Sequence, residues 1–156
     1  MVAGRSGSAF TAEIGSMKMR EEIDALRTMG LDPIDVLALP RVVALVVGLP
    51  ILAFLGSLAA LTGGAVVAKF DGGMSFATFA TRLQEAVTLS DFEVGMIKAP
   101  AMALIIGAVA CTEGLRVAGS AESLGIQTTA SVVKSIFSVI AADMVFTAFF
   151  YYGSDH

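Results

Sequence analysis

The sequence has few of the residue types on which metal sites, disulfides and hydrolase triads depend. Only 15% of its 156 residues are charged, and it has one cysteine, one histidine and no tryptophan. A single cysteine, Cys111, excludes an internal disulfide and any site built from several thiolates. One histidine, His156 at the end of the chain, leaves little for a metal site or a Ser-His-Asp triad.

Several sequence signals are also absent. The formal net charge is −4 without a basic cluster, so we expect no nucleic-acid partner. The first residues lack an apolar segment after a basic start, so we expect no signal peptide. The chain contains no Gly-x-x-x-x-Gly-Lys phosphate-binding loop. We therefore expect this chain to bind no nucleotide, metal or other cofactor.

Apolar residues make up 56% of the sequence, and its mean hydropathy is +0.81. Soluble domains have roughly a quarter of their residues charged, so this composition indicates an integral membrane protein. We predict an all-α, polytopic membrane protein that forms a single membrane domain over 1–156, with about three complete transmembrane helices.

Three segments are apolar and long enough to cross a bilayer. Residues 42–68 contain no charge, and a helix of about 27 residues spans ~40 Å. The other predicted spans are 91–115 and 132–152. Pro50 predicts a kink in the first span, and Ser90 with Glu93 predicts a capping box at the start of the second.

Small residues recur every four positions on two spans, the spacing at which helices in a bilayer approach closely. We expect both rows to contact another helix and Cys111 to be a small buried residue. The rows are Gly56, Ala60 and Gly64 on the first span, and Ala99, Ala103, Gly107 and Cys111 on the second.

Three other segments flank the spans. Residues 1–18 are rich in small residues, and we interpret them as the end of an earlier helix whose beginning is missing. Residues 116–131 are rich in Gly, Ser and Thr and predict a cytoplasmic loop with a short helical piece. Residues 74–88 predict an amphipathic external helix. Its apolar face contains Phe76, Phe79, Ala80, Leu83 and Val87.

Residues 19–33 are the most highly charged part of the chain. A helix here would end at Gly30, which tolerates the left-handed conformation, and Pro33 would prevent its continuation. So short a helix must dock onto something. It is either a polar surface helix or a contact surface for a partner. Its apolar side contains Met19, Ile23, Leu26 and Met29.

Two charges, Lys98 and Asp143, lie well inside the predicted spans and not at their ends. Lys98 lies about one turn into the second span, where it either extends to the lipid headgroups or faces a cavity and meets an anionic group such as a phosphate. Asp143 lies near the middle of the third span. It should face protein or water, be protonated or pair with a cation. A structural polar contact and a role in a transport path both remain open for Asp143.

The distribution of Lys and Arg predicts the orientation of the chain. Basic residues are more frequent in the segments around the charged stretch and before the last span, so we expect these segments to be cytoplasmic. These residues are Arg5, Lys18, Arg20, Arg27, Arg41, Arg116 and Lys134, against Lys69, Arg82 and Lys98 on the other side.

Short motifs lie before the charged stretch, at its end and near the last span. They include Gly4, Arg5, Gly7, Glu13, Gly15, Asp32 and Pro33 early in the chain, and Gly125, Thr128, Thr129 and Asp143 later. Together they resemble the signature of the MlaE (YrbE) family of ABC-transporter permeases, over the C-terminal portion of the family's length. The chain departs from that pattern at Ile126 and Ala130, where relatives often have basic residues.

The resemblance implies that the charged helix is a coupling helix that docks on a separate ABC ATPase, which binds ATP and Mg. It also implies a multi-pass protein of the bacterial inner membrane that moves phospholipid. The implied partners are a second copy of the permease, a periplasmic MCE-domain protein and in some cases a STAS-domain subunit. The apolar anchor would be Met19, Ile23, Leu26 and Met29, and the polar rim would be Glu21, Glu22, Asp24 and Arg27.

The resemblance also suggests a substrate path. Lys98, near the outer end of an apolar cavity, would neutralise a headgroup phosphate. Two other functions remain open from the residues alone. One is a membrane scaffold that recruits a soluble partner without translocation, and the other is a small secondary carrier that uses Asp143 as a proton or ion site.

Overall fold

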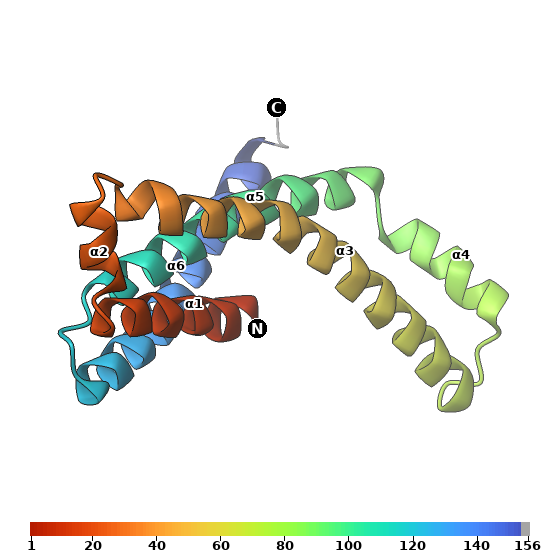
Figure 1. Cartoon of the computed structure of the whole chain (residues 1–156). Helices are drawn as coiled ribbons and strands as arrows, with labels where there is room; N and C mark the ends of the chain where they lie inside the picture. The colour runs from red at the N-terminus through yellow and green to blue at the C-terminus, as the bar shows by residue number, and fades with distance from the viewer. Residues whose placement is uncertain (154–156) are drawn as a thin grey trace.

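The computed structural model describes residues 1–153, and within them the secondary structure is entirely helical (Figure 1). This confirms the predicted all-α architecture. A five-residue π-helix, η1 (Ile34–Ala38), continues directly into α3. The α-helices are α1 (Val2–Met19), α2 (Glu22–Thr28), α3 (Leu39–Phe70), α4 (Phe76–Ala86), α5 (Leu89–Leu115) and α6 (Ala121–Gly153).

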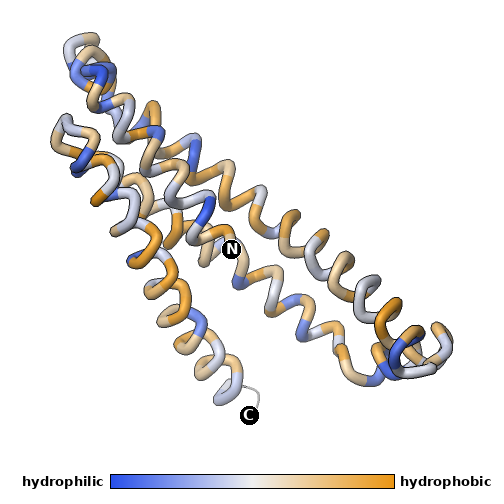
Figure 2. The backbone as a smooth tube through the Cα atoms, turned by 90° about the horizontal axis from the view of Figure 1, so that it is seen from below, coloured by the Kyte–Doolittle hydropathy of each residue, from blue (hydrophilic) through white to orange (hydrophobic). Residues whose placement is uncertain are grey.

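Three helical segments are long and apolar enough to cross a membrane, as predicted. They are Ile34–Phe70, Leu89–Leu115 and Ala121–Gly153. Figure 2 shows apolar residues along the length of these helices. Many large apolar side chains, such as those of Leu52, Phe137 and Met144, are exposed on the surface of the chain. A bilayer would remove this surface from water, as expected for helices that face lipid.

The core lies where α1, α5, α6 and the first part of α3 pack together. α1 contacts both α5 and α6, and α3 contacts α5. Buried residues are concentrated on α5, where Ala103 and Ala110 are completely inaccessible and Ile106 is nearly so. Figure 1 shows α3 bending and leaving this bundle, as Pro50 predicts, with α4 alongside its far half.

The two rows of small residues have different environments. The α5 row is buried, as predicted. A Cβ atom on Gly107 would lie 2.9 Å from Val42 Cγ2, so α3 approaches α5 closely there. The α3 row has few neighbours, in contrast to the expectation that it contacts another helix along its length. Within the described part of the chain, a Cβ on Gly56 would meet no atom within 4 Å, and one on Gly64 would meet only Phe79 of α4, at 3.9 Å.

Two predicted helix starts were wrong. The capping box of α5 is formed by Thr88 and Asp91, whose side chains each accept the other's backbone N–H, so this helix begins at Leu89 and not at 91. Most of the predicted loop 116–131 is helical, because α6 begins at Ala121. This first part of α6 packs on α1, where the missing side chain of Gly15 leaves room for Leu124. A tertiary contact thus overrides the loop-like composition of this segment.

The charged helix is shorter than predicted. Met19 is the last residue of α1, and α2 contains only seven residues. Glu21 separates the two helices because it adopts a left-handed conformation with φ +61°, which costs free energy for a residue with a side chain. Gly30 has φ +80° after the helix, as predicted, and Pro33 precedes η1.

Helix α4 has the predicted amphipathic pattern. Ser75 caps its first turn by accepting the N–H of Thr78 at 3.2 Å. Phe79 and Leu83 are half-buried, whereas the other side chains of the helix are exposed. Lys69 Nζ lies 4.6 Å from the centroid of the Phe76 ring, across the turn between α3 and α4. The amphipathic face of α4 is therefore turned toward α3.

Candidate functional site

The charged helix α2 packs on the bundle through its buried residue, Ile23. Ile23 is only 2% exposed and packs with Ile14 of α1, Ala38 of η1 and Cys111 of α5. The assignment of Ile23 to a partner-binding anchor was therefore wrong. A seven-residue helix is unstable alone, so its most apolar side chain is used to hold it against its own chain. Cys111 is buried, as predicted.

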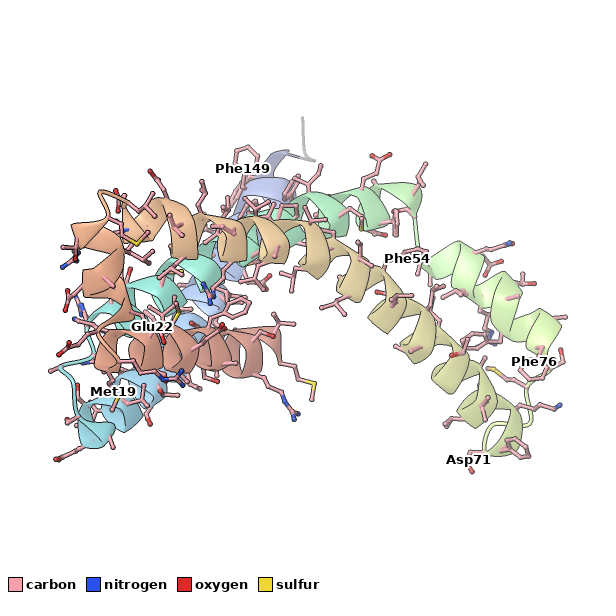
Figure 3. The ribbon with its side chains drawn as sticks, in the orientation of Figure 1. Met19, Glu22, Phe54, Asp71, Phe76 and Phe149 are labelled. Atoms are coloured by element: carbon pink, nitrogen blue, oxygen red, sulfur yellow. The ribbon has the colours of Figure 1, made fainter. Side chains whose placement is uncertain are left out.

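The outer side of α2 and the residues after it remain uncovered. Met29 is 74% exposed and Leu31 is 42% exposed, whereas Met19 and Leu26 are half-buried. Figure 3 shows Met19 and Glu22 at this end of the molecule, far from Phe76 at the start of α4. The surface around α2 therefore presents apolar side chains at one end of the bundle.

Acidic side chains surround these apolar ones. Glu21 and Asp24 are exposed, and Glu22 is half-buried. Two ion pairs lie on the surface, Arg20–Glu22 at 3.6 Å and Arg27–Asp24 at 3.8 Å. Pairs this exposed contribute little to stability. Further acidic groups follow α2 at Asp32 and Asp35, both exposed, so this surface has a net negative charge.

The early motif residues position the helices around α2. Gly7 and Gly15 are buried on α1, and a Cβ on Gly15 would lie only 2.6 Å from Val117 Cγ2. Asp32 Oδ1 accepts the N–H of Ile34 at 3.0 Å, which stabilises the start of η1. Pro33 is buried beside it. Gly4 faces α6, and Arg5 is exposed.

Glu13 and Arg41 form an ion pair between α1 and α3. Arg41 Nη2 lies 2.6 Å from Glu13 Oε1, and Arg41 Nη1 donates to the carbonyl oxygen of Leu37 at 2.9 Å. The Arg41 side chain is 19% exposed and that of Glu13 is 57% exposed. The sequence resemblance included Glu13 but did not indicate its partner.

Lys98 and Asp143 form an ion pair with each other across α5 and α6. Of the alternatives predicted for Asp143, pairing with a cation is the one observed. The anionic group that Lys98 meets is the Asp143 carboxylate. Lys98 also lines two grooves. One has a volume of about 790 Å³ and includes Phe146 and Phe149 of α6. The other, of about 410 Å³, is mostly apolar.

The sequence analysis missed a buried polar cluster near the other end of α5. Glu113 is 3% exposed, and its Oε1 lies 2.6 Å from Lys134 Nζ and 3.5 Å from Arg116 Nη1. Among the described residues, Glu113 Oε2 has no hydrogen-bond partner. No role was predicted for Glu113 from the sequence. The available signal was its position one turn after Ala110, on the same side of α5.

A second polar contact joins α1, α5 and α6. Thr11 is fully buried, and its hydroxyl lies 2.7 Å from Ser131 Oγ and 3.0 Å from the carbonyl oxygen of Ala110. Close packing of small side chains and buried hydroxyls is the usual contact between helices in a bilayer. These three helices therefore form one body, to which α2 is attached.

A family model described as Permease MlaE matches residues 1–149. The chain belongs to the MlaE permease family. Among relatives, it is 36% identical to the Arabidopsis thaliana protein TRIGALACTOSYLDIACYLGLYCEROL 1, chloroplastic, over 99% of this chain and 44% of that protein. It is 34% identical to a probable ABC transporter permease of Synechocystis, over 99% of this chain and 59% of that protein.

A probable ABC transporter permease of Rickettsia conorii is 32% identical over 97% of the chain and 58% of its own length. This MlaE-family chain therefore spans about half the length of the curated relatives it matches. The family match includes all of α1, α2, α3, α4 and α5 and most of α6. It thus covers both the surface around α2 and the Lys98–Asp143 ion pair.

Proposed function

We propose that this MlaE-family chain is a membrane permease subunit of an ABC transporter that moves phospholipid or a related lipid. A separate ATPase drives it by docking on the surface around α2. The observation that carries this proposal is the exposure of Met29 and Leu31 beside acidic side chains, in a segment that connects α1 to the first span. Exposed apolar side chains with a polar rim are the usual composition of a protein interface.

The connection of α2 to two other helices supports a coupling role. α2 follows α1 after two residues and is itself followed by η1 and α3. A force on α2 would reach the bundle through Ile23, which belongs to one buried apolar cluster with Ile14 of α1, Ala38 of η1 and Cys111 of α5. In this scheme the bundle has two arrangements of its helices, and the nucleotide state of the ATPase determines which of them is adopted.

The grooves at Lys98 support a lipid as the substrate. The larger one combines aromatic side chains, including Phe146 and Phe149, with the charged side chain of Lys98, whose ion-pair partner is Asp143. The smaller one is bounded by apolar side chains such as Leu49 and Met102. Apolar walls with a few polar groups suit acyl chains with a charged headgroup. The Arabidopsis relative is named for a galactolipid, which is compatible with a lipid substrate.

The remaining parts of the proposal come from the family resemblance. They are a homodimer of the permease, an MCE-domain protein, a STAS-domain subunit and location in a bacterial inner membrane. The cytoplasmic position of α2 is predicted instead by the distribution of Lys and Arg in the sequence. In this scheme the ATPase subunit binds ATP and Mg and hydrolyses the nucleotide, while the permease chain contributes the lipid pathway.

Substitution of the exposed apolar residues tests the docking step. With the permease expressed from its native locus, we expect the double variant Met29→Asp with Leu31→Asp to lose co-purification of the ABC ATPase that binds the unmodified permease. Lipid transfer should be lost at the same time. The control is Phe70→Asp, which changes an 80% exposed residue at the far end of α3. An ATPase that stays bound to the double variant would contradict the proposed docking surface.

A further inference from the structure

We infer that Glu13 and Arg41 are positioning residues that make α1 and the first span move together when α2 is displaced. Their ion pair is the link through which docking at α2 reaches α3. This inference rests on the proposed function, because it concerns how the force from a docked ATPase is transmitted. It identifies two residues outside the docking surface that are needed for transport and not for ATPase binding.

The first observation is the way Arg41 is held. One edge of its guanidinium binds the Glu13 carboxylate of α1, and Nη1 binds the carbonyl oxygen of Leu37 in η1. Because the guanidinium is rigid and planar, both contacts fix its orientation together. The Arg41 side chain is mostly buried, at 19% exposed, so water offers its guanidinium few alternative hydrogen-bond partners. The side chain therefore connects α1, η1 and the start of α3.

The second observation is the position of Ile23. Its side chain belongs to one buried apolar cluster with Ile14 of α1 and Ala38 of η1. These are the two elements that the Glu13–Arg41 pair joins. A movement of α2 therefore pushes on both, and without the ion pair the push would separate them. Apolar contacts are not directional, so they do not resist sliding as a hydrogen-bonded pair does.

The third observation is the geometry of η1. Leu39 N–H bonds to the carbonyl oxygen of Ile34, five residues earlier, so the helix is widened at this point. Single π-helical turns are rare in proteins, and those that occur are often found at functional sites. Arg41 reaches back across this turn to Leu37. The ion pair thus lies at the one place in the described Ile34–Phe70 segment where the helical geometry departs from α.

The fourth observation is that α3 is held on its other side immediately after Arg41. Val42 contacts α5 at Gly107, where a Cβ would be 2.9 Å away. α3 is thus fixed to α1 by Arg41 and to α5 by Val42, close to its start. Beyond the bundle, the far half of α3 is exposed and is accompanied by α4 (Figure 1). A small rotation at the fixed end would produce a larger displacement of that arm.

The test uses the permease with its ATPase in vesicles of phosphatidylethanolamine and phosphatidylglycerol that contain a fluorescent phospholipid. The variants are Glu13→Gln, Arg41→Gln and the double reversal Glu13→Arg with Arg41→Glu. Three quantities are measured: ATPase co-purification, ATP hydrolysis and the amount of lipid moved per ATP hydrolysed. Glu122→Gln is the control, because it neutralises an exposed carboxylate in the first turn of α6.

We expect each single variant to retain the ATPase and to hydrolyse ATP within about twofold of the unmodified complex, while lipid moved per ATP falls about tenfold. These sizes follow from loss of a charged hydrogen bond. The double reversal should recover part of the ratio, and Glu122→Gln should leave it unchanged. Partial recovery also distinguishes transmission from misfolding of a single variant.

Three results would overturn the inference. They are an unchanged ratio in both single variants, loss of the ATPase from them, or a double reversal as impaired as the singles. Loss of the ATPase would mean that the pair acts on docking. The unmodified complex separately tests the proposed function. If it binds no ATPase, the proposed function fails. If it binds the ATPase and moves lipid, and the single variants move as much lipid per ATP hydrolysed, only the role of Glu13 and Arg41 is rejected.

Discussion

The close contact of α1 with α5 at Gly114 predicts that Gly114→Ala destabilises the bundle. A Cβ atom at this position would lie 2.8 Å from Ile14 Cβ and 3.2 Å from the backbone oxygen of Thr11. A side chain could rotate away, but a Cβ and a backbone oxygen move only with the helix. The substitution would therefore force α1 and α5 apart and lengthen the 3.0 Å contact between Thr11 and Ala110.

The expected loss follows from three effects. Overpacking of a close contact costs about 1–3 kcal/mol. Weakening of a hydrogen bond between membrane helices adds about 0.6 kcal/mol. Replacement of glycine by alanine within a helix returns about 1 kcal/mol. We expect a net loss of about 1–2 kcal/mol in the free energy of unfolding, which corresponds to about a 5–30-fold change in the unfolding equilibrium.

Cys111 provides the assay because it is the single cysteine and is only 7% exposed, one turn from Gly114. Pulse labelling with a thiol-reactive dye during a detergent titration measures the fraction of unfolded chain. The curve should coincide with loss of helical circular dichroism. Gly114→Ala should shift the midpoint to a lower mole fraction of dodecyl sulfate.

Gly48→Ala is the matched control, because a Cβ there would meet no atom of the described residues within 4 Å. It should be neutral or slightly stabilising, since alanine is the better helix former. If Gly114→Ala unfolds at the same detergent fraction as the unmodified chain, or if both variants are equally destabilised, the contact at Gly114 does not have the predicted effect.

Two further predictions concern the buried polar groups. Lys134→Met should lower the free energy of unfolding by about 3 kcal/mol and Glu113→Gln by about 1 kcal/mol in the detergent titration. The reason is that Lys134→Met leaves the buried Glu113 carboxylate with only its 3.5 Å contact to Arg116, whereas Glu113→Gln removes the charge. The opposite order would contradict this prediction. Thr11→Val and Ser131→Ala should each cost about 1 kcal/mol, and together hardly more than either alone, since they share one 2.7 Å hydrogen bond. Additive losses in a double-mutant cycle would exclude that coupling.

The sequence was sufficient for features set by local pattern and by the thickness of a bilayer. The spans follow from apolar runs long enough to cross a bilayer, and the buried side of α5 follows from small residues spaced four apart. The start of α5 was misplaced by two residues because Ser90 and Glu93 offer the same capping pattern as Thr88 and Asp91. When two neighbouring residue pairs both fit the capping-box pattern, the sequence does not show which of them begins the helix, and the helix geometry is needed to decide.

The sequence alone therefore determined the class of the protein, its helices and the identity of its most charged segment. Tertiary structure decided which side of that segment is free. Ile23 is buried because the left-handed Glu21 turns α2 back onto α1, η1 and α5. It also decided the pairing of Lys98 with Asp143 and of Arg41 with Glu13. Each of these contacts joins different helices, and helical periodicity specifies a face of a helix but not the helix that will cover it.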